Sequence, residues 1–179
     1  QEGNNAYSMN GLGNYYYNVE KNYSQAEKYY KDGCNLGNAW ACSNLAGKYQ
    51  YIDKNYDLAV KIYKQALAIE HNDRAAYELG RIFSFDFNME TYNDKKYAIS
   101  MLTKVSKEYE LYYDAMNFVG EIYKKESDYR SAIYYFQLAA QAGLPRALNN
   151  LGVMYHNGTG VSKDLTIAYG YYLWAVVMG

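Results

Sequence analysis

Proline, cysteine and histidine are all scarce in this sequence. Among its 179 residues there is one proline, and there are two cysteines and two histidines. Because proline interrupts helices, a chain with a single proline is free to form long, unbroken ones. His71 and His156 are far apart in the sequence, and two thiols without a second pair nearby do not provide the ligands of a zinc site. We therefore expect no metal ion and no cofactor.

An excess of positive charge and a long apolar run are also missing. The formal net charge is −1 at pH 7. Nucleic acids and anionic lipids select surfaces with a surplus of Lys and Arg, so neither is expected as the main partner. No apolar run approaches the roughly 18 residues that a membrane-spanning helix needs. We expect no integral membrane segment.

Catalytic motifs are missing too. The sequence contains no His-Glu-x-x-His, no Gly-x-Ser-x-Gly and no Ser-x-x-Lys site that fits a penicillin-binding enzyme. Gly158-Thr159-Gly160 is followed by Val161-Ser162-Lys163, so it is typical of a turn between helices and does not form a phosphate loop. We predict that the protein is not an enzyme and has no catalytic residues.

What the sequence does contain is a repeated helical pattern and 25 tyrosines. A small residue is followed four positions later by a large apolar residue, then by Gly or Ala, and three positions further on by an aromatic residue. These positions lie on one face of a helix, and the pattern recurs every 32 to 40 residues. Its five copies are Ser8/Leu12/Gly13/Tyr16, Ala41/Leu45/Ala46/Tyr49, Ala75/Leu79/Gly80/Phe83, Ala115/Val119/Gly120/Tyr123 and Ala147/Leu151/Gly152/Tyr155.

A second helix is predicted after each copy, around a small residue that can pack closely. These residues are Ala26, Ala59, Ala98, Ala132 and Ala168. A single pair of short helices cannot bury its apolar faces alone, so neighbouring pairs must stack on one another. The pattern predicts an all-α, right-handed α/α superhelical solenoid of about five helix-turn-helix repeats, forming a single domain over residues 1–179. The predicted units cover approximately 6–37, 38–72, 73–111, 112–143 and 144–179.

The repeat resembles those of known families. The Leu-Gly-x-x-Tyr pattern and its spacing are similar to tetratricopeptide repeats. The closing unit, with Tyr155, Asn157-Gly158-Thr159-Gly160-Val161, Asp164 and Ala168, resembles a Sel1-like repeat, which has a longer Gly-containing loop between its helices. This resemblance implies a helical binding scaffold for a protein or peptide partner.

The two cysteines flank a predicted corner between repeats. Cys34 ends the second helix of the first unit, and Cys42 lies in the first helix of the second unit. Antiparallel helices joined by such a corner can bring these positions face to face. The spacing resembles that of the Helicobacter cysteine-rich proteins, Sel1-like repeat proteins in which a cysteine pair bridges adjacent helices, and this resemblance implies a disulfide. Buried free thiols are the alternative. A disulfide would indicate an oxidising compartment, and so a bacterial periplasmic or secreted protein, with the cytoplasm as the alternative location.

One loop is longer than the others and unusually apolar. It spans Ser84 to Asp94 and carries Phe85, Phe87, Met89 and Tyr92. It either folds back on the edge of the solenoid or contacts a partner.

The candidate partner site follows from the tetratricopeptide resemblance, which implies that the first helices line a concave binding face. Asparagine can bond to a peptide backbone, Tyr and Trp provide rigid apolar area, and Arg binds carboxylates. Asn14, Asn44 and Arg74 match three positions of the carboxylate clamp of some tetratricopeptide domains, whereas Glu78 would repel a carboxylate or neutralise Arg74. The predicted set is Tyr7, Asn10, Asn14, Trp40, Asn44, Arg74, Tyr77, Arg81, Asn117, Arg146, Asn149 and Asn150. The alternative is an ordinary solvated face without a specific ligand.

The predicted function is that of a non-catalytic protein–protein interaction scaffold or adaptor that binds a peptide or protein partner on its concave face. One alternative is an inhibitor or immunity-type protein directed at a single toxin or enzyme. Another is a Sel1-like cell-wall protein that binds or hydrolyses penicillin or muropeptides.

Overall fold

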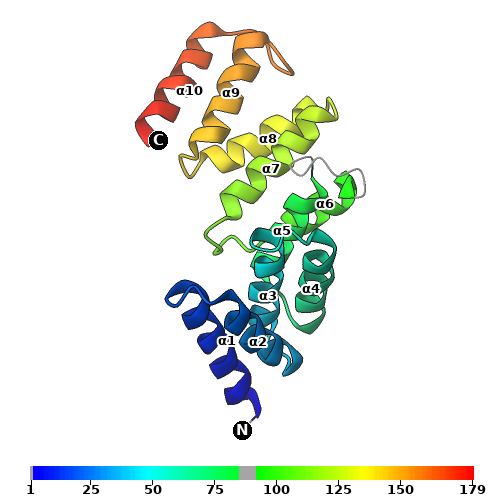
Figure 1. The fold of residues 1–179 in the computed structure, drawn as a ribbon. Helices are drawn as coiled ribbons and strands as arrows, with labels where there is room; N and C mark the ends of the chain where they lie inside the picture. Colours follow the sequence, from blue (N-terminus) through cyan, green and yellow to red (C-terminus); the bar gives the residue numbers. More distant parts are fainter. Residues whose placement is uncertain (1, 85–91) are drawn as a thin grey trace. The chain divides into compact units, whose positions relative to one another are not determined.

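Ten helices make up the described part of the chain, which comprises residues 2–84 and 92–179 of the computed structural model, and this part contains no strand (Figure 1). The helices are α1 (Glu2–Asn18), α2 (Tyr23–Asn35), α3 (Ala39–Tyr51), α4 (Tyr56–Ile69), α5 (Asp73–Phe83), α6 (Lys95–Leu102), α7 (Tyr112–Lys125), α8 (Tyr129–Ala140), α9 (Pro145–Asn157) and α10 (Leu165–Met178). The all-α repeat fold predicted from the sequence is confirmed. None of these helices is both long and apolar enough to cross a lipid bilayer.

Short polar residues fix where most of the helices begin. Each accepts a hydrogen bond from the backbone N–H three positions further on, which satisfies one of the free donors at a helix N-terminus. These capping residues are Asn22, Asn38, Asn55, Asn72, Asp94, Asp128 and Asp164. Pro145 occupies the first turn of α9, where its missing N–H costs nothing, and Gly158 ends the same helix in the left-handed conformation.

The chain divides into two compact units, Gln1–Leu79 and Gly80–Gly179. In the first unit α1 packs on α2, α2 on α3 and α3 on α4. In the second unit α7 packs on α8, α8 on α9 and α9 on α10. Figure 1 shows the antiparallel helix pairs in each unit. The proposed contact loop is only partly described, because Phe85, Phe87 and Met89 lie outside the described residues.

The glycine of the repeated pattern lies where the two helices of a pair touch. A Cβ atom built on Gly120 would stand 2.6 Å from Cδ1 of Phe136, and one built on Gly152 would stand 2.5 Å from Cε1 of Tyr172. Both distances are too short for a carbon–carbon contact, so only glycine permits this approach. Phe136 and Tyr172 each stand four positions after the small residue of the second helix. In the earlier repeats the equivalent residues are Tyr30, which faces Gly13, and Leu102, which faces Gly80.

Stacked tyrosines close three of the helix pairs. Tyr16 stacks on Tyr29 with ring centroids 5.3 Å apart and an interplanar angle of 7°. The ring pairs Tyr123/Tyr135 and Tyr155/Tyr171 are stacked in the same way, at 5.6 and 5.7 Å. In these three repeats the aromatic residue that ends the pattern therefore covers the second helix, which explains part of the abundance of tyrosine.

Four of the five large apolar positions of the pattern are core residues, and Leu12 is the exception. Leu45, Leu79, Val119 and Leu151 are buried, but Leu12 is 41% exposed. Leu12 lies on α1, and the two helices that pack on α1, α2 and α3, do not cover this side chain.

Cys34 and Cys42 form a disulfide bond between α2 and α3. Both residues are buried, and their Cα atoms are 4.6 Å apart. Gly37, with a φ of 85°, makes the tight turn between the two helices that brings the cysteines together. The alternative of buried free thiols is therefore not what the structure contains.

Candidate functional site

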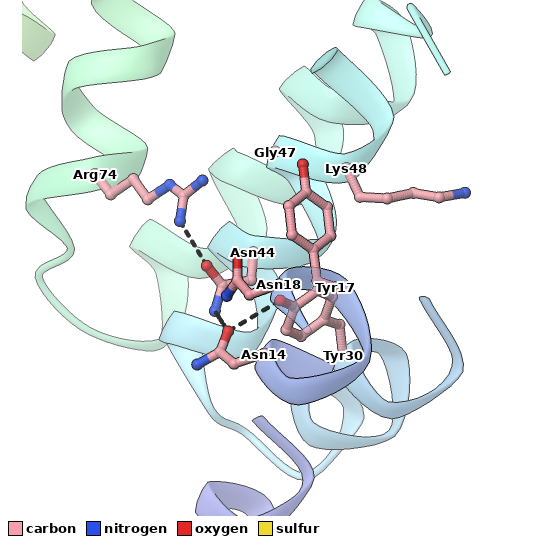
Figure 2. A pocket seen from close by; sticks show the side chains of 8 residues that line it. All are labelled: Asn14, Tyr17, Asn18, Tyr30, Asn44, Gly47, Lys48 and Arg74. Atoms are coloured by element: carbon pink, nitrogen blue, oxygen red, sulfur yellow. Dashed lines mark hydrogen bonds between the residues drawn. The ribbon is translucent and has the colours of Figure 1, made fainter. Parts of the chain in front are cut away.

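Three asparagines and an arginine form a hydrogen-bonded cluster across α1, α3 and α5 of the first unit, and Figure 2 shows its members Asn14, Asn44 and Arg74. Asn44 donates from Nδ2 to Oδ1 of Asn10 at 2.8 Å and to Oδ1 of Asn14 at 3.1 Å. Arg74 donates from Nη1 to Oδ1 of Asn44 at 2.6 Å. The hydroxyl of Tyr30 donates to Oδ1 of Asn14 at 2.9 Å. Asn44 thus uses its donors and its acceptor internally, and we call Asn10, Asn14, Asn44 and Arg74 the asparagine–arginine cluster.

A pocket of about 130 Å³ opens beside this cluster. Gly47 makes room for the guanidinium, because a Cβ atom at that position would lie 2.8 Å from Nη2 of Arg74. Figure 2 shows the side chains of Asn14, Asn44 and Arg74 converging on one another. The pocket is lined by Asn14, Tyr17, Asn18, Tyr30, Asn44, Gly47, Lys48 and Arg74.

Arg74 has no carboxylate partner among the side chains that the structure describes. Within residues 5–84 and 92–179, no carboxylate is ion-paired with its guanidinium. Among the described residues Glu78 forms no ion pair with Arg74, so the expected neutralisation of Arg74 is not observed, and the alternative that Glu78 repels a carboxylate stays a prediction. The Glu78 carboxylate is buried and accepts hydrogen bonds from Nε2 of Gln50 at 3.1 Å and from the hydroxyl of Tyr51 at 2.7 Å. Gln50 and Tyr51 thus donate neutral hydrogen bonds that stabilise the Glu78 carboxylate.

Lys48 also lines the pocket, but its charge is compensated. Its Nζ lies 2.5 Å from Oε2 of Glu27 and 2.8 Å from Oδ2 of Asp53, and Figure 2 shows the side chain extending away from Arg74. Burial disfavours the charged ammonium, but the hydrogen bonds to Asp53 and Glu27 outweigh burial and raise the pKa of Lys48. The hydrogen bond from Lys48 lowers the pKa of Glu27. Arg74 is thus the cation that the pocket offers to a ligand.

The tyrosines of the pocket are neutral hydrogen-bonding groups. Burial raises the pKa of Tyr30 to about 12, although the nearby charge of Arg74 acts in the opposite direction. Burial also raises the pKa of Tyr17. Both phenols therefore stay protonated at neutral pH and add no negative charge that would compete with an acidic ligand for Arg74.

The second unit repeats the asparagine arrangement with the opposite charge. Asn150 donates from Nδ2 to Oδ1 of Asn117 at 3.2 Å and to Oε1 of Glu121 at 3.4 Å, and Asn117 donates to the same carboxylate oxygen at 2.8 Å. Counted from the large apolar residue of its copy, Asn150 is equivalent to Asn44, Asn117 to Asn10 and Glu121 to Asn14. Glu121 replaces Asn14, so this cluster is negative and unsuited to a carboxylate.

A second, shallower cavity lies between α9 and α10. It measures about 520 Å³ and is lined by Pro145, Arg146, Asn149, Tyr172, Ala175 and Val176. Arg146 forms an ion pair with Asp114, and its guanidinium carbon lies 5.9 Å from the ring centroid of Phe118. Two predicted site residues, Arg146 and Asn149, thus meet here, but the cation already has a carboxylate partner.

The other predicted residues differ in their exposure. Tyr7 and Trp40 are exposed on α1 and α3, where a partner can contact them. Tyr77 and Asn117 are almost completely buried and have little surface left for a partner. The guanidinium of Arg81 lies 5.7 Å from the ring centroid of Phe118.

Sequence reasoning missed Asn18, Tyr30, Gly47 and Lys48 as pocket residues. Of these, only Tyr30 could have been found from the sequence, because it stands four positions after Ala26, the small residue of the second helix, and this position faces Gly13. The same relation recurs in the later repeats.

The repeat pattern matches two described families. The Sel1 repeat matches residues 6–38, 114–144 and 145–175, and the tetratricopeptide repeat matches residues 41–77. The Sel1 matches cover just over half of the chain, so the chain belongs to the Sel1 repeat family. The three stacked tyrosine pairs all fall within the Sel1 matches.

A curated protein and several solved structures are similar to this chain. A 100-residue stretch is 37% identical to the ERAD-associated E3 ubiquitin-protein ligase component HRD3 of Candida glabrata; it covers 55% of this chain and 12% of that protein. A Sel1 repeat protein from Oxalobacter formigenes superposes with a TM-score of 0.81 at 24% identity, over 98% of this chain and 74% of that chain. A protective antigen of uropathogenic Escherichia coli with an SLR fold gives 0.78 at 24% identity, over 95% of this chain and 38% of that chain. At these identities the structural likenesses establish the fold.

Proposed function

We propose that the chain is a non-catalytic scaffold for protein–protein interaction and that its asparagine–arginine cluster binds an acidic group of the partner. The observation that carries the proposal is Arg74, whose guanidinium lines a pocket and is not ion-paired with any carboxylate of the described side chains. A partly buried charge is costly unless it is paired. A carboxylate from a partner would supply the missing pair and form charge-assisted hydrogen bonds with the guanidinium.

The neighbours of Arg74 support this choice of ligand. Nη1 is held by Asn44, which fixes the orientation of the planar guanidinium before a ligand arrives. Nδ2 of Asn14 is a further donor, because the hydrogen bonds to Asn14 occupy only its oxygen. A ligand that meets prepositioned donors loses little additional entropy on binding. The pocket volume of about 130 Å³ suits a single side chain or chain terminus of a partner.

Exposed aromatic side chains on the same helices would contribute apolar contact. Tyr7 on α1 and Trp40 on α3 are both exposed, and aromatic residues of this kind are frequent energetic centres of interfaces. We propose that the partner lies along α1, α3 and α5 and places its acidic group beside Arg74.

The comparisons support a scaffold role. Sel1 and tetratricopeptide repeats are generally non-catalytic scaffolds, and the yeast relative is by its name a component of a ligase assembly. The disulfide between Cys34 and Cys42 supports a location in an oxidising compartment outside the cytoplasm.

The test is selection from a library of displayed peptides of random sequence. We expect enrichment of peptides with an Asp, a Glu or a free C-terminus, and we expect Arg74→Met to weaken their binding. Losing a charge-assisted pair costs about 1.5–3 kcal/mol, which is roughly a 10- to 150-fold loss of affinity. Arg130→Met on the exposed surface of α8 is the matched control and should bind like the parent. Enrichment of the same peptides by Arg74→Met would contradict the proposal.

A further inference from the structure

Gly47 is a glycine that the packing of the helices does not require. It is buried inside α3, where glycine is a poorer helix former than alanine. A Cβ atom on Gly120 would strike the core ring of Phe136, but a Cβ atom on Gly47 would lie 2.8 Å from Nη2 of Arg74. Its next neighbour would be the hydroxyl of Tyr63 at 3.6 Å, which is an ordinary contact. Among the described residues, the one group that needs a glycine here is therefore the end of the Arg74 side chain.

A methyl group at position 47 would displace the guanidinium and nothing else. The guanidinium would have to move away from α3 by roughly 0.5–1 Å to restore an ordinary contact with the new Cβ atom. Its Nη1 is bonded to Oδ1 of Asn44 on the same helix at 2.6 Å. Because the guanidinium is planar and moves as a unit, this hydrogen bond would lengthen and the group would change direction.

A second arginine at the equivalent position allows a comparison within the chain. Counted from the large apolar residue of its copy, Arg146 is equivalent to Arg74, and Glu121 of α7 is equivalent to Gly47. Arg146 pairs with Asp114, and its side chain is 60% exposed. The arginine that follows a side chain at this position is thus neutralised and lies largely in solvent. The copies other than the second carry these residues at the position of Gly47: Asn14, Arg81, Glu121 and Val153.

We propose that Gly47 positions the Arg74 guanidinium for an acidic group and restricts this role to arginine. The inference rests on the proposed function, because it concerns the geometry of the same pocket. Gly47 acts through Arg74: the missing Cβ atom lets Nη2 approach α3 while Asn44 holds Nη1, so the planar group has a defined direction. A carboxylate bonds best to two N–H groups of one guanidinium plane. The ammonium group of lysine has no such plane and gains nothing from the glycine.

Calorimetric titration with an acidic peptide selected by the parent protein tests this inference. Gly47→Ala should weaken binding by about 10-fold, at the lower end of the loss expected for Arg74→Met, because the charge remains but is displaced. Arg74→Lys should also weaken binding, and adding Gly47→Ala to it should have no further effect, because lysine has no Nη2 to displace. Gly170→Ala, where no atom lies within 4 Å of the new Cβ atom, is the matched control and should bind like the parent.

Urea denaturation of the same variants distinguishes a positioning role from a structural one. Gly47→Ala should raise the urea midpoint, because alanine favours the helix and the displaced atoms belong to the end of a flexible side chain. Weaker binding by a protein that is more stable than the parent cannot result from damage to the fold.

The outcomes separate this inference from the proposed function. Binding of Gly47→Ala at the parent's affinity, with Arg74→Met impaired, would overturn the role of Gly47 and leave the acidic site in place. Parent-like binding by Arg74→Met would overturn both. An equal loss from Gly47→Ala in the parent and in Arg74→Lys would show that Gly47 acts without Arg74, and a lower urea midpoint would show that the methyl group disturbs the core. Either of these results would also overturn the inference.

Discussion

Replacing Gly120 by Ala tests whether glycine is required where the helices of a pair touch. The new Cβ atom would lie 2.6 Å from Cδ1 and 2.7 Å from Cε1 of Phe136, a fully buried ring. The ring must move by roughly 1 Å to restore an ordinary contact, and overpacking of this kind costs about 1–3 kcal/mol. Because α3 carries Ala46 at the equivalent position, we place the cost in the lower part of that range, at about 1–2 kcal/mol.

The same substitution also stabilises the helix itself, because Ala is a better helix former than Gly by about 1 kcal/mol. Gly170→Ala isolates this stabilisation, since no atom lies within 4 Å of a Cβ built on Gly170 in α10. We expect Gly170→Ala to raise the free energy of unfolding by about 1 kcal/mol. Gly120→Ala should then be less stable than Gly170→Ala by about 1–2 kcal/mol.

Urea denaturation followed by far-UV circular dichroism measures both variants. If Gly120→Ala stabilises the protein as much as Gly170→Ala, the close approach of α7 and α8 is not what the glycine provides.

Three further predictions concern stability. Leu79→Ala removes a fully buried side chain and should lower the free energy of unfolding by about 2–5 kcal/mol in urea titrations. The pKa of Glu27 is lower in the folded state than in the unfolded state. Its charge therefore stabilises the fold above the ordinary pKa of Glu, and this stabilisation is lost as the pH falls through the pKa of the folded state. Glu27→Gln should therefore lower the free energy of unfolding at pH 7, and this free energy should fall less steeply with acidification than in the parent. A fall as steep as the parent's would contradict the stabilising role of the Glu27 charge. Replacing Cys34 and Cys42 by Ala should lower the melting temperature, with a loss of about 2–3 kcal/mol, and a reducing agent should have a comparable effect on the parent.

The repeats were predictable because their signals are local. The spacing of Leu45, Leu79 and Leu151 identifies helices with one apolar face, and Asn38 and Asp164 indicate where helices begin. Such signals depend on neighbours within one or two turns, and a single sequence displays them directly.

The candidate site was predictable only in part, because its bonds join different repeats. The sequence indicated that Asn14, Asn44 and Arg74 share a face, and the structure brings all three into hydrogen-bonded contact. It did not show that Glu78 would turn to Gln50 and Tyr51, since that depends on how neighbouring helices are rotated about their axes. The exposure of Leu12 was missed for a related reason, because burial of this position depends on which helix packs against it, and the pattern of one repeat does not contain that information.

The most direct test of the account is a double-mutant cycle on an acidic peptide selected by the parent protein. Calorimetric titration would measure the peptide and its variant with the acidic residue replaced by the corresponding amide, each against the parent and Arg74→Met. The account predicts a coupling free energy of about 1.5–3 kcal/mol between the acidic group and Arg74. Additive effects, with a coupling indistinguishable from zero, would contradict the claim that Arg74 binds the acidic group of the partner.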